Sequence, residues 1–161
     1  MLSANGVLTV ALVGLAGLVG GPTGANAEAA LWVVHSGAGV GPILLGASPA
    51  AVRAILGAPD AIHERTYVYA DGLSIMFRED DTVRAIYLSS GPDFTHPVPF
   101  AARTPEAIGF GSTRAEVDAW LGAGMRVVPN AGARGVEIVE PATGGILVTV
   151  YYGKVVELIV V

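Results

Sequence analysis

An internal repeat constrains the fold of this chain more than any other feature of the sequence. Residues 43–57 align with residues 108–122 at an offset of 65, and isoleucine, glycine, valine, alanine and leucine recur at the same positions. Residues 82–88 align with residues 154–160 at an offset of 72, because the second copy has a longer loop at 129–135. Two copies are too few for a solenoid, so we expect a tandem pair of units of roughly 55 residues each.

Each copy opens with a short helix whose two ends are specified by local residues. Ser48 is a good cap for the first helix, and Thr113 caps the second with Glu116 three residues later, which makes a capping box. Gly57 and Gly122 stand where a left-handed C-terminal cap is needed. One apolar stripe per helix follows from the i, i+3, i+4 spacing of Val52, Ile55 and Leu56, and of Val117, Trp120 and Leu121.

Strands follow the first helix, and the turn between two of them decides which tyrosines are exposed. Leu73, Ile75 and Phe77 alternate with polar or smaller neighbours, so this strand has a core face and an open face. A two-residue turn at Asp71-Gly72 is the favoured hairpin connection, and it places Tyr67 and Tyr69 on the open face. A three-residue turn starting at Ala70 would instead bury both tyrosines, because a slip of one residue exchanges the two faces.

The second copy ends in a hairpin that is apolar on both faces. Residues 146–152 and 155–161 form its strands, and Gly153-Lys154 joins them. We expect a helix to cover one face. We expect the sheet of the first copy to continue into this hairpin. The alternative is that a partner molecule covers the apolar surface that the helix leaves.

These patterns predict an α+β fold made of two tandem copies of a short helical segment packed on an antiparallel β-sheet. The first repeat spans residues 28–92, a proline-rich joint spans 93–104, and the second repeat spans 105–161.

The first 27 residues have the pattern of a cleaved export signal. Residues 7–19 form an uncharged apolar run of thirteen, which suits a signal-peptide core and is shorter than the roughly 20 residues of a membrane span. Ala25-Asn26-Ala27 is a small-x-small cleavage signature, so we expect cleavage after Ala27 and a secreted or periplasmic protein with no membrane span. Arginine outnumbers lysine eight to one, which is typical of a GC-rich bacterial genome.

Composition excludes several classes of function. The chain has no cysteine, which rules out disulfides, iron–sulfur clusters, thiolate zinc sites and a cysteine nucleophile. A net charge of −5 with nine basic residues argues against nucleic acid as a partner.

The opening of each repeat resembles a known group of exported proteins. The string Gly41-Pro42-Ile43-Leu44-Leu45-Gly46, followed by Ala-Ser-x-x-x-Val-x-x-x-Leu-Gly-x-Pro, is similar to the repeat opening of β-lactamase-inhibitory-protein-like modules and of the small outer-membrane assembly lipoproteins. In that group a short helical hairpin packs on an antiparallel sheet, and tandem copies form a concave surface that binds other proteins. The cysteines of the inhibitor and of a lipoprotein anchor are missing here, so the resemblance implies a fold and a protein-binding surface, and it does not imply lactamase inhibition.

Little in the sequence points to chemistry. His35, His63 and His96 have no spacing that suits a shared metal, and Glu79-Asp80-Asp81 lacks the ligand order of a calcium loop. A triad of Ser36, His63 and Asp60 is suggested by composition alone. We therefore predict no catalytic residue, no cofactor and no metal site.

The sequence instead favours a binding module that docks a protein or peptide on a tyrosine-rich open sheet face, since tyrosine and arginine dominate interface hot spots. The expected partner-binding residues are Tyr67, Tyr69, Met76, Arg78, Arg84, Tyr87 and Tyr151. Two alternatives stay open. One is a small-ligand-binding or hydrolytic protein with a pocket between the repeats that uses His63 or His96, and the other is a structural envelope protein that dimerises through its C-terminal hairpin.

Overall fold

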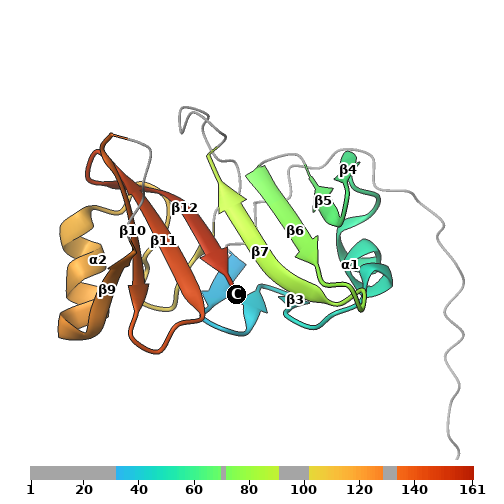
Figure 1. Ribbon diagram of the computed structural model, residues 1–161, viewed down its shortest axis with the longest axis horizontal. Coiled ribbons are helices and arrows are strands. Elements are labelled where there is room, and N and C mark those ends of the chain that lie inside the picture. Colours follow the sequence, from blue (N-terminus) through green and yellow to red (C-terminus); the bar gives the residue numbers. More distant parts are fainter. Residues whose placement is uncertain (1–31, 70–71, 91–101, 129–133) are drawn as a thin grey trace, which may run out of the picture.

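The structure is a computed structural model that describes residues 32–69, 72–90, 102–128 and 134–161 (Figure 1). The expected leader, residues 1–27, lies outside this range. The helices are α1 (Pro49–Leu56) and α2 (Arg114–Leu121), and the short 3-10 helix η2 (Gly122–Gly124) follows α2. The strands are β1 (Trp32–His35), β2 (Gly39–Val40), β3 (Ile43–Leu44), β4 (Ala61–His63), β5 (Thr66–Val68), β6 (Leu73–Phe77), β7 (Val83–Ser89), β8 (Ala102–Arg103), β9 (Met125–Val128), β10 (Val136–Pro141), β11 (Ile146–Tyr151) and β12 (Lys154–Val160).

Eight strands form one sheet, in which two four-stranded meanders meet at their last strands. The strand order is β4-β5-β6-β7-β12-β11-β10-β9, so α1 precedes the four strands on one side and α2 precedes the four on the other. The central pair, β7 and β12, is antiparallel, with Glu157 opposite Ser89 and Val160 opposite Ile86. The expected continuation of the sheet into the C-terminal hairpin is therefore present, and the overall class is α+β.

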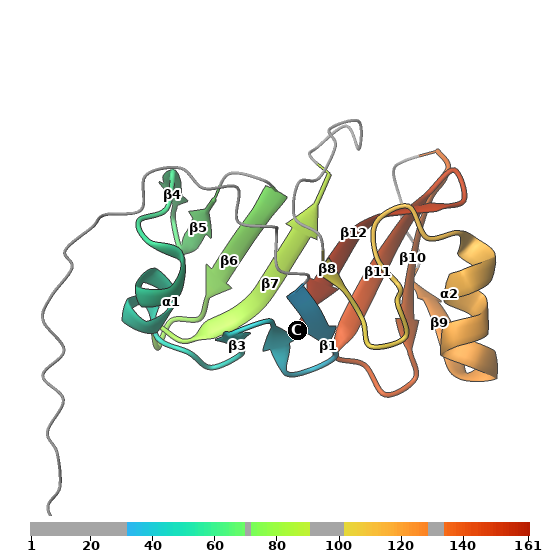
Figure 2. The ribbon, with the colours of Figure 1, turned by 180° about the vertical axis from the view of Figure 1, so that it is seen from behind.

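A second, four-stranded sheet with the order β3-β2-β1-β8 lies between the two helices (Figure 2). Strand β1 pairs with β2 in the antiparallel sense and with β8 in the parallel sense. Beyond β8 the chain turns back, and Arg103 forms a bridge with Gly109. The β2–β3 hairpin and this 103–109 turn thus flank β1 from opposite sides.

Residues aligned by the repeat make the same backbone contacts in the two halves. The Gly46 N–H donates to the Val83 carbonyl, and the Gly111 N–H donates to the Val155 carbonyl, each at 2.9 Å. Gly46 has a φ of +80° and Gly111 a φ of +79°, a conformation that L side chains rarely adopt. The offset of 65 relates the two glycines, and the offset of 72 relates the two valines.

The same correspondence extends to a β-bulge in each half. The pairing of β6 with β7 shifts between Met76 and Phe77, which leaves Arg84 as the extra residue. The pairing of β11 with β12 shifts between Thr149 and Val150, which leaves Val156 as the extra residue. Arg84 and Val156 are 72 residues apart, so each bulge bends its strand at the aligned position.

Both helices begin and end as their sequences predict. The Ser48 hydroxyl accepts a hydrogen bond from the Ala51 N–H at 3.2 Å, and Thr113 forms the complete capping box with Glu116. The Thr113 N–H donates to the Glu116 carboxylate, and this bond together with the Thr113 hydroxyl lowers the pKa of Glu116 below its usual value. Gly57 and Gly122 follow the helices at φ of +82° and +63°.

The core lies on one side of the eight-stranded sheet, where both helices and the small sheet cover it (Figures 1 and 2). Val52 of α1, Val117 of α2 and Val34 of β1 are fully buried there. The sheet contributes the alternating residues of its central strands, which include Leu73, Ile75, Ile86, Leu88, Ile146, Val148, Leu158 and Val160, each at most 1% exposed. No helix among the described residues is long and apolar enough to cross a membrane.

Candidate functional site

The face of the eight-stranded sheet opposite the helices, called the outer face from here on, carries a row of half-buried side chains across its centre. Strand register places Tyr87 opposite Ser74 on one neighbour and opposite Ile159 on the other. Ile159 in turn lies opposite Leu147. Because these residues alternate with fully buried neighbours, their side chains point away from the core.

Tyr67 and Tyr69 do not lie on this outer face, so the expected two-residue turn is wrong. The Tyr69 N–H donates to the Leu73 carbonyl, which leaves three residues between them, and Val68 lies opposite Ser74. The preceding strand is therefore shifted by one residue, and Tyr67 lies opposite Ile75 on the core side.

Both tyrosines have structural contacts on the core side. The Tyr67 ring packs edge-on against Phe77 with centroids 4.7 Å apart, and its hydroxyl accepts from Arg53 at 2.6 Å. Tyr69 is 9% exposed, and burial raises the pKa of its hydroxyl. These two side chains stabilise the packing of α1 on the sheet.

Met76 and Tyr87 do share the outer face, as expected from the sequence. Met76 lies opposite Ala85, and the Tyr87 hydroxyl lies 3.8 Å from the Met76 sulfur. Both side chains are half-buried. They form an apolar platform with one polar hydroxyl, a composition that suits a protein contact.

Two arginines stand at the end of this platform near the β6–β7 turn. Arg78 is held in place, because its guanidinium donates to the Val83 carbonyl at 3.3 Å and approaches the Thr82 hydroxyl at 3.5 Å. Arg84 is the exposed residue of the bulge and has no hydrogen bond or ion pair with any described residue. One arginine is thus fixed by the fold and the other is available to a ligand.

An open cavity of about 320 Å³ lies between these arginines and Met76. The β4–β5 turn closes it through Arg65, whose guanidinium donates to the Arg78 carbonyl at 2.9 Å. The sequence alone does not indicate Arg65, since nothing local distinguishes it from any charged turn residue. Its place here depends on the pairing of β5 with β6, in which Thr66 lies opposite Met76.

Tyr151, the last expected partner-binding residue, lies apart from this group. It pairs with Lys154 at the start of β12, whereas Arg84 belongs to the start of β7, and these two strands run in opposite directions. Tyr151 packs edge-on against Tyr152 with ring centroids 4.5 Å apart. Tyr151 and Arg84 therefore occupy opposite ends of the outer face.

The acidic turn at residues 79–81 is organised by its own hydrogen bonds. The Asp80 carboxylate accepts from the Thr82 hydroxyl at 2.7 Å and from the Thr82 N–H at 3.1 Å. The hydroxyl contact in particular lowers the pKa of Asp80. No cluster of three or more histidine, cysteine, aspartate or glutamate side chains with metal-binding geometry occurs within the described residues.

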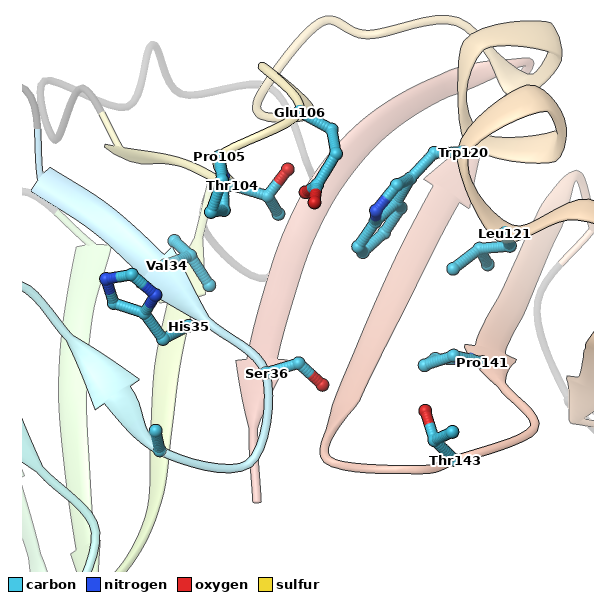
Figure 3. A pocket seen from close by; sticks show the side chains of 11 residues that line it. Val34, His35, Ser36, Thr104, Pro105, Glu106, Trp120, Leu121, Pro141 and Thr143 are labelled. Atoms are coloured by element: carbon cyan, nitrogen blue, oxygen red, sulfur yellow. The ribbon is translucent and has the colours of Figure 1, made fainter.

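A second cavity, of about 550 Å³, lies between the β1–β2 turn and α2 (Figure 3). His35 and Ser36 line it from the first half, and Trp120 and Glu106 line it from the second. The Ser36 hydroxyl donates to the Gly144 carbonyl at 3.1 Å.

The residues proposed for hydrolytic chemistry do not meet at this cavity. His63 is an exposed residue of β4, a strand at the edge of the large sheet, and neither it nor Asp60 lines the space beside Ser36. His96 lies outside the described residues. The suggested triad of Ser36, His63 and Asp60 is therefore not assembled.

Comparison of the chain with protein families, with curated proteins and with solved structures found no match.

Proposed function

We propose that this chain is an exported, non-enzymatic binding module that docks a protein or peptide on the outer face of its large sheet. The observation that carries the proposal is the grouping of Met76 and Tyr87 beside the free guanidinium of Arg84. Three of the seven residues expected from the sequence thus lie together on one surface, and Arg78 borders it.

The chemistry of this surface favours a partner with an acidic group next to an apolar one. The planar guanidinium of arginine can donate two parallel hydrogen bonds to one carboxylate. Arg84 has room to reorient because it has no partner among the described residues, while Arg78 is fixed by Val83 and Thr82. An apolar side chain of the partner would then cover Met76 and Tyr87.

We further infer that the two halves are tandem copies of one unit that consists of a short helix followed by a four-stranded meander. The support is the repetition of glycine conformation, hydrogen bonds, bulge and helix cap at aligned positions. Joining the copies through β7 and β12 makes one continuous outer face that is twice as wide as one unit provides.

The proposal is tested by partner capture followed by affinity measurement. The protein is used as bait on envelope and secreted fractions of the producing organism, and the captured partner is identified and titrated. The variants Tyr87→Ala and Arg84→Ala each remove one hot-spot side chain, so affinity should fall by roughly tenfold or more. Circular dichroism checks that each variant remains folded.

Matched controls lie at the far edge of the same sheet. Arg126→Ala removes an exposed arginine of β9, and Val127→Ser removes a side chain that is 52% exposed on the same strand. Both should bind with unchanged affinity. If the outer-face variants bind as tightly as the controls, the proposed surface is wrong. If no partner is captured, light scattering tests whether the chain self-associates through its C-terminal hairpin.

A further inference from the structure

Both halves of the molecule line the cavity between the β1–β2 turn and α2. The β1–β2 turn docks on the β10–β11 turn, where the Gly37 N–H donates to the Gly145 carbonyl at 2.8 Å. Ser36 reaches the adjacent Gly144 carbonyl from the same side. These bonds fix the floor of the cavity, and α2 with the 104–106 segment forms the opposite wall.

Trp120 and Glu106 both line this second wall of the cavity. Figure 3 shows the Glu106 carboxylate directed toward the indole ring, while the His35 imidazole lies on the other side of the cavity. Glu106 has no hydrogen bond or ion pair with any described residue. The nearby Arg103 guanidinium donates to the Ala107 carbonyl at 2.8 Å and forms no ion pair with Glu106, so the carboxylate is available to a ligand.

The aligned region of the first half has neither group. Ile55 stands at the position of Trp120, and it is 43% exposed. The β2–β3 hairpin turns through Gly41-Pro42 and has four residues between the paired Gly39 and Leu44. The turn that carries Glu106 is one residue longer, with five residues between the paired Arg103 and Gly109. Trp32 covers this shorter turn so closely that a Cβ on Gly41 would lie 2.8 Å from its ring.

We propose that this cavity binds an ammonium or guanidinium group attached to an apolar body. Tryptophan is the best aromatic face for a cation, and the Glu106 carboxylate on the same wall supplies the counter-charge. The volume of about 550 Å³ falls in the ordinary range of small-molecule sites.

The remaining polar groups of the cavity also suit a donor-rich ligand. The Ser36 hydroxyl donates its hydrogen bond to the Gly144 carbonyl, so its lone pairs can accept a hydrogen bond from a ligand. Thr143 also lines the cavity (Figure 3). Accepting oxygens therefore come from both halves of the molecule, and no lysine or arginine of the described residues lines the space.

The test uses probes that share one skeleton and differ in charge. Phenethylammonium, neutral phenethyl alcohol and anionic hydrocinnamate are titrated into the ¹⁵N-labelled protein while the indole N–H signal of Trp120 is followed. The Trp120→Phe variant assigns that signal. Nα-acetyl-lysine methylamide is added as a fourth probe, since it distinguishes a basic side chain of a partner from a free amine as the natural source of the cation.

Phenethylammonium should shift the Trp120 signal to saturation, and hydrocinnamate should not. The Glu106→Gln variant should bind phenethylammonium about tenfold more weakly, because it loses a charge-assisted hydrogen bond. Glu79→Gln removes the same charge from the distant β6–β7 turn and should bind as the parent does.

The proposal is overturned if the three phenyl probes bind alike, since the cavity is then merely apolar. Equal affinity of the parent and the Glu106→Gln variant would also overturn it, as would the absence of any shift.

Discussion

The two halves of the molecule have the same backbone scaffold and different exposed side chains. At the bulge position, the first half presents the exposed Arg84 and the second half buries Val156 at 9% exposure. At the second position of the helix stripe, Ile55 is exposed in the first half, and Trp120 lines a cavity in the second. Each half thus carries its own candidate site, and each site uses a position whose side chain differs between the halves.

This difference distinguishes aligned positions that carry the same residue in both halves from aligned positions that carry different residues. Gly46 and Gly111 have positive φ, a conformation that favours glycine at both places. Val52 and Val117 both fill the same fully buried contact between helix and sheet. Substitutions at conserved pairs should therefore have equal effects in the two halves, and this symmetry is testable.

The largest equal effect is expected at Ile43 and Ile108, the same side chain at aligned positions. Their side chains are 0% and 5% exposed. Replacing either by alanine removes buried methyl groups and leaves a cavity, so each variant should lose about 2–5 kcal/mol of unfolding free energy. Urea titration followed by circular dichroism measures both losses.

The same titrations also report whether the halves unfold together. Buried residues of both halves belong to a single core cluster, which predicts one cooperative transition for the parent and both variants. A loss confined to one variant, or two separate transitions, would show that the halves are not equivalent.

A smaller equal effect is expected at the paired glycines. A Cβ on Gly46 or Gly111 would meet no atom within 4 Å, so alanine is accommodated in space and only its backbone is strained. Gly46→Ala and Gly111→Ala should each cost about 1–2 kcal/mol, the usual penalty of a left-handed conformation for an L residue. The midpoint of thermal unfolding of each variant relative to the parent checks this, and a neutral effect at either site would contradict the positive φ angles of the two glycines.

The helices could be predicted from the sequence because their signals are local. Ser48 and Thr113 cap the helices as predicted, and Gly57 and Gly122 end them at the predicted positions with positive φ, although their ψ values of −161° and −158° lie outside the left-handed helical region. The two repeat offsets added information on long-range contacts. They relate Gly46 to Gly111 and Val83 to Val155, and the structure has the same glycine–valine hydrogen bond in both halves. The α+β class followed from these two signals.

The register of Tyr67 and the two cavities could not be predicted, because they depend on contacts between distant segments. The Asp71-Gly72 dipeptide favours a two-residue turn locally. The packing of Tyr69 among buried residues instead fixes a register with three residues between Tyr69 and Leu73. Trp120 has the spacing of a core residue, and only the approach of the β1–β2 turn reveals a cavity beside it. Tertiary packing overrode the local signal in both cases.

An unequal effect is expected at the helix caps, because only the second half has a glutamate that completes a capping box. Ser48→Ala and Thr113→Ala each remove the hydroxyl that accepts the N–H of the third helical residue, Ala51 or Glu116, so each should cost about 0.5–2 kcal/mol. The loss should be larger for Thr113, because its hydroxyl also bonds the Glu116 carboxylate. Equal losses in denaturant titrations would contradict a working capping box in α2.

The smallest effect is a pH dependence of the capping box, which only the second half has. The contacts with Thr113 hold the pKa of Glu116 below 4.5 in the folded chain. A carboxyl with a lowered folded pKa stabilises the protein above its unfolded pKa, and that stabilisation is lost as the pH falls through the folded value. Glu116→Ala should therefore be less stable than the parent at neutral pH, and the gap should shrink on acidification below 4.5.

Alanine at this position also reproduces the cap of the first half, because Ala51 is the residue aligned with Glu116. The exposed Ala51→Glu variant makes the reciprocal change and offers a carboxylate to the free N–H of Ser48. It should gain stability at neutral pH and lose that gain over the same acidic range. Thermal unfolding of the three proteins across this range measures both changes. If the gap between the parent and Glu116→Ala does not change with pH, the carboxylate does not act through its charge, and the two helix caps are equivalent despite their different sequences.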